Sequence, residues 1–292
     1  MSRRSIAGRR ASQNAWVLTL TSIAAIGILV ALLWALGQRR PITAGNDREL
    51  VVYCAAGMVK PLERIGEQYE NEYGVRVQFR PNGSKALLAE LRKLPAAADL
   101  FLAADEDTMA EARRDGIVSE AMLVAVQRPV IAFRKGYPHE DIQSLNDLLR
   151  PGIRLALPNP ETASIGSVVR KARPHDWERL EQQLSSFDTK ISFAGTVTDV
   201  ANLVKVGASA DAGIIWDSNA RQFGLDYVLP KELSDVRDHV MLAVVARCER
   251  PADAQRFARY VTARDRGERV LAEYHYETIA DADLWDNGGK AP

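Results

Sequence analysis

The stretch V-V-Y-C-A-A-G-M, residues 51–58, joins a strand pattern directly to small residues and then to a helical pattern. Valine and tyrosine favour a strand, whereas Met58–Tyr73 has the apolar spacing of a helix that stops before Gly74. The A-A-G between the two patterns leaves the strand end almost without side chains, so another group can approach the backbone closely. We therefore expect a ligand at this strand end.

The same order of strand and then helix repeats along the chain. The first unit is expected to contain strands at Leu50–Cys54, Val75–Phe79 and Asp99–Ala103, and helices at Met58–Tyr73, Ser84–Lys93 and Glu106–Asp115, the last with Asp105 as N-cap. A second unit is expected to contain helices at Ser144–Leu149, Ser164–Arg173 and Asp199–Val206, with strands at Ile153–Leu157, Lys190–Ala194 and Ala212–Trp216. This order predicts an α/β fold with mostly parallel sheets and helices on both faces.

Two long extended runs, Val124–Arg134 and Val236–Cys248, join the two units, and two final helices (Ala252–Thr262 and Arg266–Tyr274) follow the second run. Two units with two crossovers predict two lobes with a cleft between them, where small ligands bind. The expected boundaries are 49–128 and 240–280 for lobe I, 129–239 for lobe II, and 281–292 for a loose polar tail.

The N-terminus differs from the rest of the chain. Residues 1–15 carry four arginines and no acid, and Trp16–Gly37 carries no charged residue. Because about 20 apolar helical residues span a bilayer, 16–37 is interpreted as a transmembrane anchor or a signal segment. The anchor is favoured, with 1–15 as a cytoplasmic basic stub and 38–48 as a linker. The rest is then exported to a periplasmic or other extracytoplasmic space.

Composition excludes several classes of protein. The 38 Lys and Arg residues balance the 38 Asp and Glu residues, which argues against a nucleic-acid partner. The four histidines are scattered and no C-x-x-C or H-E-x-x-H motif occurs, so no metal site with direct protein ligands is expected. Cys54 and Cys248 are left open as either a disulfide or two small buried side chains.

Loops of small and polar residues follow the strands and lead into helices. They read A-A-G after Cys54, R-P-N-G-S after Phe79, P-N-P-E-T-A-S-I-G after Leu157, and G-T-V-T-D-V after Ala194. The first turn of a helix has free N–H groups and a partial positive charge. Four such helix starts at one cleft would form an anion site that needs no cationic side chain.

The chain resembles the periplasmic molybdate-binding proteins of ABC uptake systems from Leu50 to about Glu277. The matching stretches are V-V-Y-C-A-A-G-M, N-G-S-K, A-A-D-L-F-L-A-A-D, R-L-A-L-P-N-P-E-T-A-S-I-G, V-T-D-V and D-A-G-I-I-W-D-S-N-A. The resemblance implies a two-lobed periplasmic-binding-protein fold (Venus-flytrap, type II), a monomer without a cofactor or enzymatic activity, and a membrane permease as partner. It also implies molybdate or tungstate as the ligand.

The resemblance implies an oxyanion held by neutral donors. The five implied positions are Gly57, Ser84, Ile165, Val200 and Trp216, and the possible auxiliary positions are Ala56, Asn82, Lys85, Thr162, Ser164 and Thr198. Two of the five depart from the pattern, because Gly57 stands in place of a serine and Trp216 in place of a tyrosine. A serine at position 57 is therefore expected to restore a hydroxyl and strengthen binding. Asp199 is expected to cap its helix rather than touch the anion.

Two other functions remain open at this stage. A ferric-iron-binding protein of the same fold would need phenolate or carboxylate ligands, and the sequence has no Tyr-Tyr pair near Trp216. A membrane-tethered oxyanion sensor would use the same site and the same anchor. An enzyme is disfavoured because no nucleophile-elbow, Walker A or dinucleotide fingerprint occurs.

Overall fold

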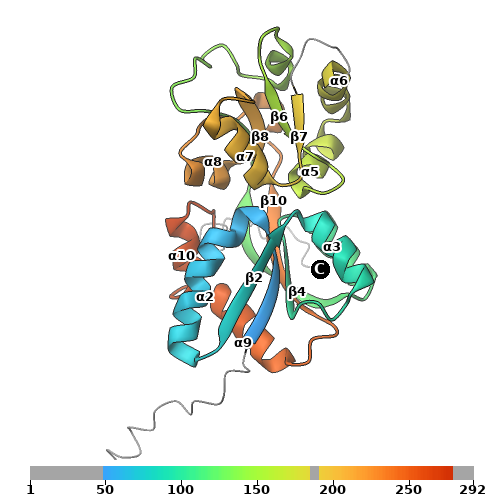
Figure 1. Cartoon of the computed structure of the whole chain (residues 1–292), viewed down its shortest axis with the longest axis vertical. Helices are drawn as coiled ribbons and strands as arrows, with labels where there is room; N and C mark the ends of the chain where they lie inside the picture. Colours follow the sequence, from blue (N-terminus) through green and yellow to red (C-terminus); the bar gives the residue numbers. More distant parts are fainter. Residues whose placement is uncertain (1–48, 185–190, 279–292) are drawn as a thin grey trace, which may run out of the picture. The chain divides into compact units, whose positions relative to one another are not determined.

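The computed structural model describes residues 49–184 and 191–278, which belong to one compact unit, Arg48–Pro292. Two five-stranded sheets, each with its own helices, make up this unit (Figure 1). The expected stub, membrane segment, linker and tail lie outside the described residues. No helix in the described ranges combines the length and the apolar character that crossing a bilayer requires.

The first sheet has the order β2-β1-β3-β10-β4. Its strands are β1 (Glu49–Ala55), β2 (Arg76–Asn82), β3 (Leu100–Ala103), β4 (Val118–Gln127) and β10 (Asp238–Val245). β1 pairs in parallel with β2 and β3, whereas β10 pairs antiparallel with β3 and β4. The sheet is therefore mixed, because the crossover strand β10 returns in the opposite direction to the first three strands.

Alternation along β1 sends successive side chains to opposite faces of the first sheet. Leu50, Val52 and Cys54 pack in a core with three helices: α2 (Val59–Tyr73), α9 (Pro251–Val261) and α10 (Gly267–Glu273). Tyr53 belongs to a second core, with α3 (Ser84–Lys93) and α4 (Glu106–Arg114). Helices thus cover both faces, as predicted, and the Asp105 side chain caps α4 by accepting from the Thr108 N–H.

The second sheet has the order β7-β6-β8-β5-β9 and one continuous core. Its strands are β5 (Pro129–Phe133), β6 (Leu155–Pro158), β7 (Ile191–Ala194), β8 (Ala212–Trp216) and β9 (Asp226–Val228). The helices are α5 (Ser164–Ala172), α6 (Pro174–Leu184), α7 (Val197–Val206) and α8 (Asp217–Phe223), with short 3-10 turns at η2 (Leu145–Leu149) and η3 (Lys231–Leu233). This sheet is also mixed, since β5 pairs antiparallel with β8 and β9. The sequence patterns missed α6, α8 and β9.

The extended run predicted at Val124–Arg134 is two strands rather than one. β4 ends at Gln127 in the first sheet, and β5 begins at Pro129 in the second sheet. Arg128 lies between them, and its backbone N–H and carbonyl bond to Asp217 of α8. The first crossover is therefore one residue long, which brings the two sheets close together at this point.

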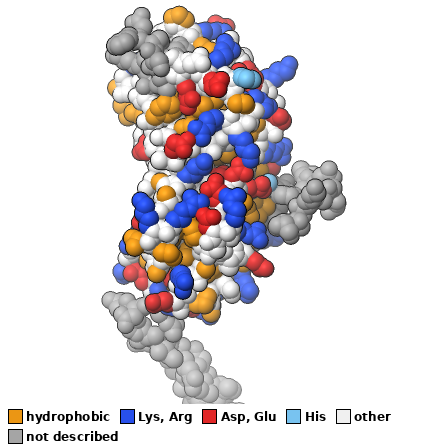
Figure 2. Space-filling view, turned by 90° about the vertical axis from the view of Figure 1, so that its right-hand side faces the viewer, with side chains coloured by type: hydrophobic (Ala, Val, Ile, Leu, Met, Phe, Trp, Pro, Cys, Tyr) orange, Lys and Arg blue, Asp and Glu red, His pale blue; other side chains and the backbone are white. Residues whose placement is uncertain are grey.

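Charged side chains are interspersed on the molecular surface. Figure 2 shows Lys and Arg mixed with Asp and Glu over the face that it presents, in keeping with a formal net charge of zero. Cys54, which is buried, and Cys248, which is partly buried, are free thiols in the structure, and the Cys248 Sγ donates to Asp99 Oδ1 at 3.2 Å.

Candidate functional site

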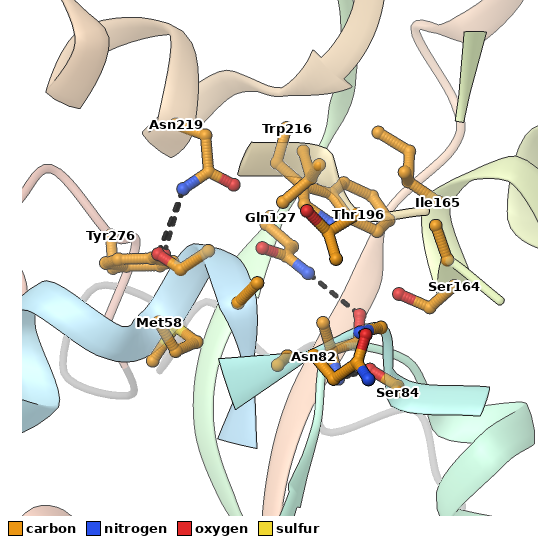
Figure 3. A pocket seen from close by; sticks show the side chains of 17 residues that line it. Met58, Asn82, Ser84, Gln127, Ser164, Ile165, Thr196, Trp216, Asn219 and Tyr276 are labelled. Atoms are coloured by element: carbon orange, nitrogen blue, oxygen red, sulfur yellow. Dashed lines mark hydrogen bonds between the residues drawn. The ribbon is translucent and has the colours of Figure 1, made fainter. Parts of the chain in front are cut away.

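Helix starts from both sheets meet around one small cavity of about 20 Å³ (Figure 3). Its lining consists of Ala55, Ala56, Gly57, Met58, Asn82, Gly83, Ser84, Ala104, Gln127, Ala163, Ser164, Ile165, Thr196, Val197, Trp216, Asn219 and Tyr276. None of these described lining residues is an Asp, Glu, Lys or Arg. The cavity is therefore walled by neutral groups, although charged residues make up 26% of the chain.

The first sheet contributes two helix starts to the cavity. A 3-10 turn, η1 (Ala56–Met58), follows β1 and leads into α2, while α3 begins at Ser84. Ser84 is 1% exposed, and its Oγ accepts a hydrogen bond from the Ala104 N–H at 3.0 Å. Since this bond uses a lone pair, the Ser84 hydroxyl hydrogen remains able to donate to a ligand.

The second sheet contributes the starts of α5 and α7. Ser164 and Ile165 are the first two residues of α5, so their amides have no partner within the helix. α7 begins at Val197, with Thr196 as N-cap, two residues before the predicted start. The Thr196 hydroxyl donates to Asp199 Oδ2 at 2.7 Å and accepts from the Asp199 N–H at 3.1 Å. Asp199 thus supports the cap at the third helical position and does not line the cavity.

Two further side chains, Asn219 and Tyr276, meet at the carbonyl oxygen of Gly57. Asn219 Nδ2 donates to this oxygen at 3.0 Å, and the Tyr276 hydroxyl donates to it at 2.8 Å. Burial raises the pKa of Tyr276 to about 12, so the phenol stays protonated and acts as a donor. Asn219 lies in α8, which belongs to the second lobe, whereas Gly57 follows β1 of the first lobe. The hydrogen bond between these two residues therefore joins the lobes.

Gln127 and Trp216 lie deep in the cavity at two strand ends. Gln127 closes β4 and is 1% exposed, and its Nε2 donates to the Ala104 carbonyl at 2.8 Å. Trp216 closes β8 and is also 1% exposed. Ala104 therefore receives a bond from Gln127 and donates one to Ser84, which fixes the loop behind the α3 start.

The structure brings most of the expected site residues together. Among the lining residues are the expected Gly57, Ser84, Ile165 and Trp216, with the auxiliary Ala56, Asn82 and Ser164. The structure does not bring Val200, Lys85, Thr162 or Thr198 to the lining. The Val200 N–H already bonds to the Thr196 carbonyl at 3.2 Å, because α7 starts at Val197, two residues before the predicted start. Val197 takes that place in the lining.

Four polar side chains of the lining were not among the site positions expected from the sequence: Gln127, Thr196, Asn219 and Tyr276. Gln127 is within the predicted extended run Val124–Arg134, and no pattern there indicated a site residue. Tyr276 follows the last predicted helix, Arg266–Tyr274. Asn219 stood in the matched stretch D-A-G-I-I-W-D-S-N-A, three residues after Trp216, but the helix that begins there was not predicted. The W-D-S-N sequence has an acid and a serine at a helix start, and this was the available signal.

A family model described as bacterial extracellular solute-binding protein matches residues 50–277. The chain therefore belongs to the bacterial extracellular solute-binding proteins, which serve transporters outside the cytoplasm and are binding proteins rather than enzymes. A Haemophilus influenzae relative described as a binding protein is 27% identical over 209 residues, or 71% of this chain and 82% of the relative.

Solved structures show the same fold. The Azotobacter vinelandii periplasmic molybdate-binding protein has a TM-score of 0.65 at 18% identity, with 78% of this chain and 98% of that chain covered. AfuA of Actinobacillus pleuropneumoniae, with fructose-6-phosphate bound, has a TM-score of 0.67 at 14% identity. The match covers 84% of this chain and 87% of the AfuA chain. Iron-bound HitA of Pseudomonas aeruginosa has a TM-score of 0.60 at 16% identity, with 84% of this chain and 88% of the HitA chain covered. At these identities the likeness concerns the fold alone.

Proposed function

We propose that this chain is the solute-binding protein of an ABC uptake system and that it takes a small tetrahedral oxyanion between its lobes. The observation that carries the proposal is the neutral cavity, where helix starts from both sheets converge without a cationic side chain. Backbone amides at helix starts bind anions through their N–H groups and the helix dipole. Molybdate and tungstate are the ions that the sequence resemblance implies.

The donors divide between the lobes, which suits a closing mechanism. Gly57 and Ser84 present donors from the first sheet, and Ile165 and Val197 present amides from the second. An anion docked on one set draws the other set onto it, and closure excludes water and strengthens each bond. Hydrogen bonds to a charged group contribute about 1.5–3 kcal/mol each, so four or five of them allow micromolar or tighter affinity.

Iron is the alternative that a structural neighbour raises, and the cavity chemistry disfavours it. Hard ferric iron requires anionic oxygen ligands such as phenolate or carboxylate. In the described lining, Tyr276 is the single phenol, and it donates its proton to the Gly57 carbonyl. The described residues also hold no cluster of three His, Cys, Asp or Glu side chains with metal-ligand geometry. A tethered oxyanion sensor would use the same cavity and differ in its membrane partner.

Calorimetric titration of the full-length chain tests the proposal. The panel contains molybdate, tungstate, sulfate and phosphate, with ferric iron as the comparison. Saturable binding of at least one tetrahedral anion, with a stoichiometry of one and no iron uptake, is expected. Tight ferric binding without any oxyanion binding would replace the proposal by the iron-binding alternative. Reconstitution with the permease then separates delivery to a transporter from a sensing role.

A further inference from the structure

The carboxamide of Asn219 has a fixed orientation in the cavity wall. Its Nδ2 lies 3.0 Å from the Gly57 carbonyl oxygen and 3.4 Å from the Tyr276 hydroxyl oxygen. The Gly57 carbonyl can only accept a hydrogen bond, so rotating the amide by half a turn would place two acceptor oxygens against each other. The nitrogen is therefore held toward Gly57, and Figure 3 shows the oxygen on the opposite side, toward the interior of the site.

The Oδ1 atom of Asn219 has no hydrogen-bond partner among the described residues, and it is buried. The whole Asn219 residue is only 1% exposed. A buried acceptor without a donor is costly, and native sites supply the donor from a ligand or from ordered water. Many of the other polar groups around the cavity are helix-start amides and hydroxyls that can donate, whereas Asn219 Oδ1 can only accept.

We infer that Asn219 is a specificity-determining residue that selects a tetrahedral oxyanion which still carries a hydrogen. The ligand class is that of hydrogen phosphate and hydrogen arsenate, whose O–H would donate to Asn219 Oδ1 while their other oxygens accept from the helix starts. This inference rests on the proposed function and narrows its ligand class. It places molybdate, tungstate and sulfate below the protonated ions, because those three carry no proton near neutral pH.

The chemistry of the donor and acceptor pair gives the direction of the selectivity. A fully deprotonated oxyanion brings only acceptor oxygens, so its contact with Asn219 Oδ1 is repulsive and leaves that oxygen unpaired. Sites built to bond a ligand hydroxyl reject analogues that lack it, because the buried polar group then loses its partner. An unpaired buried acceptor lowers affinity by about 10- to 100-fold.

Gly57 and Asn219 form a matched pair in this arrangement. A Cβ atom at position 57 would lie 2.6 Å from Asn219 Oδ1 and 2.9 Å from its Nδ2. The absence of a side chain at Gly57 therefore creates the space that the Asn219 amide occupies. The departure at position 57 brings an acceptor into the site in place of a hydroxyl donor, which changes the kind of anion that fits.

The size of the cavity favours an inorganic ion over a phosphate ester. The cavity volume is about 20 Å³, which is small for a ligand that carries a sugar beside its tetrahedral group. A sugar phosphate would present the same tetrahedral group and a neighbouring hydroxyl donor, but its sugar would need further room. Inorganic phosphate and a sugar phosphate therefore share the recognised chemistry and differ in bulk, and the experiment must separate them.

The test compares pairs of anions matched in charge and shape that differ by one proton. Near pH 8, phosphate and arsenate are mainly hydrogen-bearing dianions, whereas sulfate and selenate are dianions without hydrogen. Calorimetry on the full-length chain is expected to show about 10- to 100-fold tighter binding of phosphate over sulfate and of arsenate over selenate. Equal or tighter binding of sulfate, selenate or molybdate would overturn the inference while the proposed function stands. Absence of binding for every tetrahedral anion would overturn both.

Variants and one further ligand complete the test. Asn219→Leu removes the acceptor and is expected to bring the phosphate-to-sulfate affinity ratio close to one. Thr162→Ala alters a hydroxyl that bonds to the Gly195 carbonyl outside the lining, and it should preserve the ratio. Thermal melting verifies that both variants fold. If Asn219→Leu does not fold, the comparison of phosphate with sulfate and of arsenate with selenate in the wild-type protein tests the inference by itself. A ratio unchanged in folded Asn219→Leu contradicts the inference. Fructose 6-phosphate that binds more tightly than inorganic phosphate would overturn the assignment to an inorganic ion.

Discussion

Lys171 of α5 donates to Asp107 of α4 at 2.6 Å, so an ion pair joins a helix of the second sheet to a helix of the first. This bond raises the pKa of Lys171, and the charges of Asp107, Asp238 and Asp105 raise it further. The pair lies outside the ligand cavity, and it can form only when the two lobes are together. Under the proposed closing mechanism, this contact stabilises the closed arrangement of the lobes.

Replacing Lys171 by alanine is expected to weaken ligand binding by about two- to fivefold at low ionic strength. The effect is small because the side chains of Lys171 and Asp107 are 70% and 51% exposed, and exposed pairs contribute about 0.2–1 kcal/mol. The loss should fade as salt screens the pair. Calorimetry across a salt series provides the measurement. Lys231→Ala removes an exposed lysine on the same lobe, and an equal loss there would assign the effect to net charge.

Gly57→Ser is expected to weaken ligand binding and lower the melting temperature, which reverses the expectation from sequence alone. The new Cβ would lie 2.6 Å from Asn219 Oδ1, 2.9 Å from its Nδ2 and 3.0 Å from Val197 Cγ1. Either the lobes separate or the Asn219 amide leaves the Gly57 carbonyl. Gly57→Ala brings the same crowding without the hydroxyl.

Combining Gly57→Ser with Asn219→Ser separates crowding from the hydroxyl itself. The smaller side chain at 219 removes the clash, so the double variant should recover part of the lost melting temperature. Calorimetry on the single and double variants supplies the comparison. Tighter anion binding by the single Gly57→Ser variant would show that Asn219 moves freely and that the close packing described here does not limit the site.

The sequence predicted those parts of the fold and site that depend on local patterns. The helix at Ser84–Lys93 begins and ends where predicted, and Ser84 lies in the cavity because a glycine and a polar turn precede it. Gly57 also lines the cavity, and it was expected there because a short window of sequence is enough to identify small residues at a strand end. The order of strands and helices likewise follows from the apolar periodicity.

The contacts that define the site are long-range and could not be read from a single window. Asn219 lies 162 residues from Gly57 along the chain, and Tyr276 lies 219 residues from it. Val200 was expected at the start of its helix, but Thr196 caps α7 and Val200 is the fourth helical residue. Such an error moves a predicted amide donor from the helix start, where it is free, into the hydrogen-bonded interior.

Asp238 at the start of β10 is expected to make stability fall as the pH rises. Burial first, and then the charge of Asp105, raise its pKa from 3.8 to about 7, while the Glu106 and His239 N–H groups oppose the rise. Between pH 3.8 and about 7, the Asp238 carboxyl therefore keeps its proton in the folded state, whereas the unfolded chain has released it. The stabilising contribution is full below the unfolded pKa of 3.8 and is lost as the pH passes about 7.

Asp238→Asn is accordingly expected to flatten the decline in melting temperature between pH 4 and 8 and to raise the melting temperature most at pH 8. Asn keeps an oxygen for the same two N–H groups. Asp235→Asn serves as the control, because Arg173 lowers the pKa of Asp235 and the removal of its charge should give no stabilisation at pH 8. An unchanged pH dependence in Asp238→Asn would show that Asp238 ionises normally in the folded protein.

Ser84→Ala is expected to lower oxyanion affinity by about tenfold or more, because a hydrogen bond to a charged ligand contributes about 1.5–3 kcal/mol. The Ala104 N–H would also lose its acceptor, so the melting temperature should fall slightly. Thr162→Ala is the matched control, since its hydroxyl bonds to the Gly195 carbonyl and it does not line the cavity. Titration of both variants with the tightest anion decides the matter. Equal affinity for Ser84→Ala and the wild type would remove the Ser84 hydroxyl from the ligand shell and leave the α3 amides as the first lobe's donors.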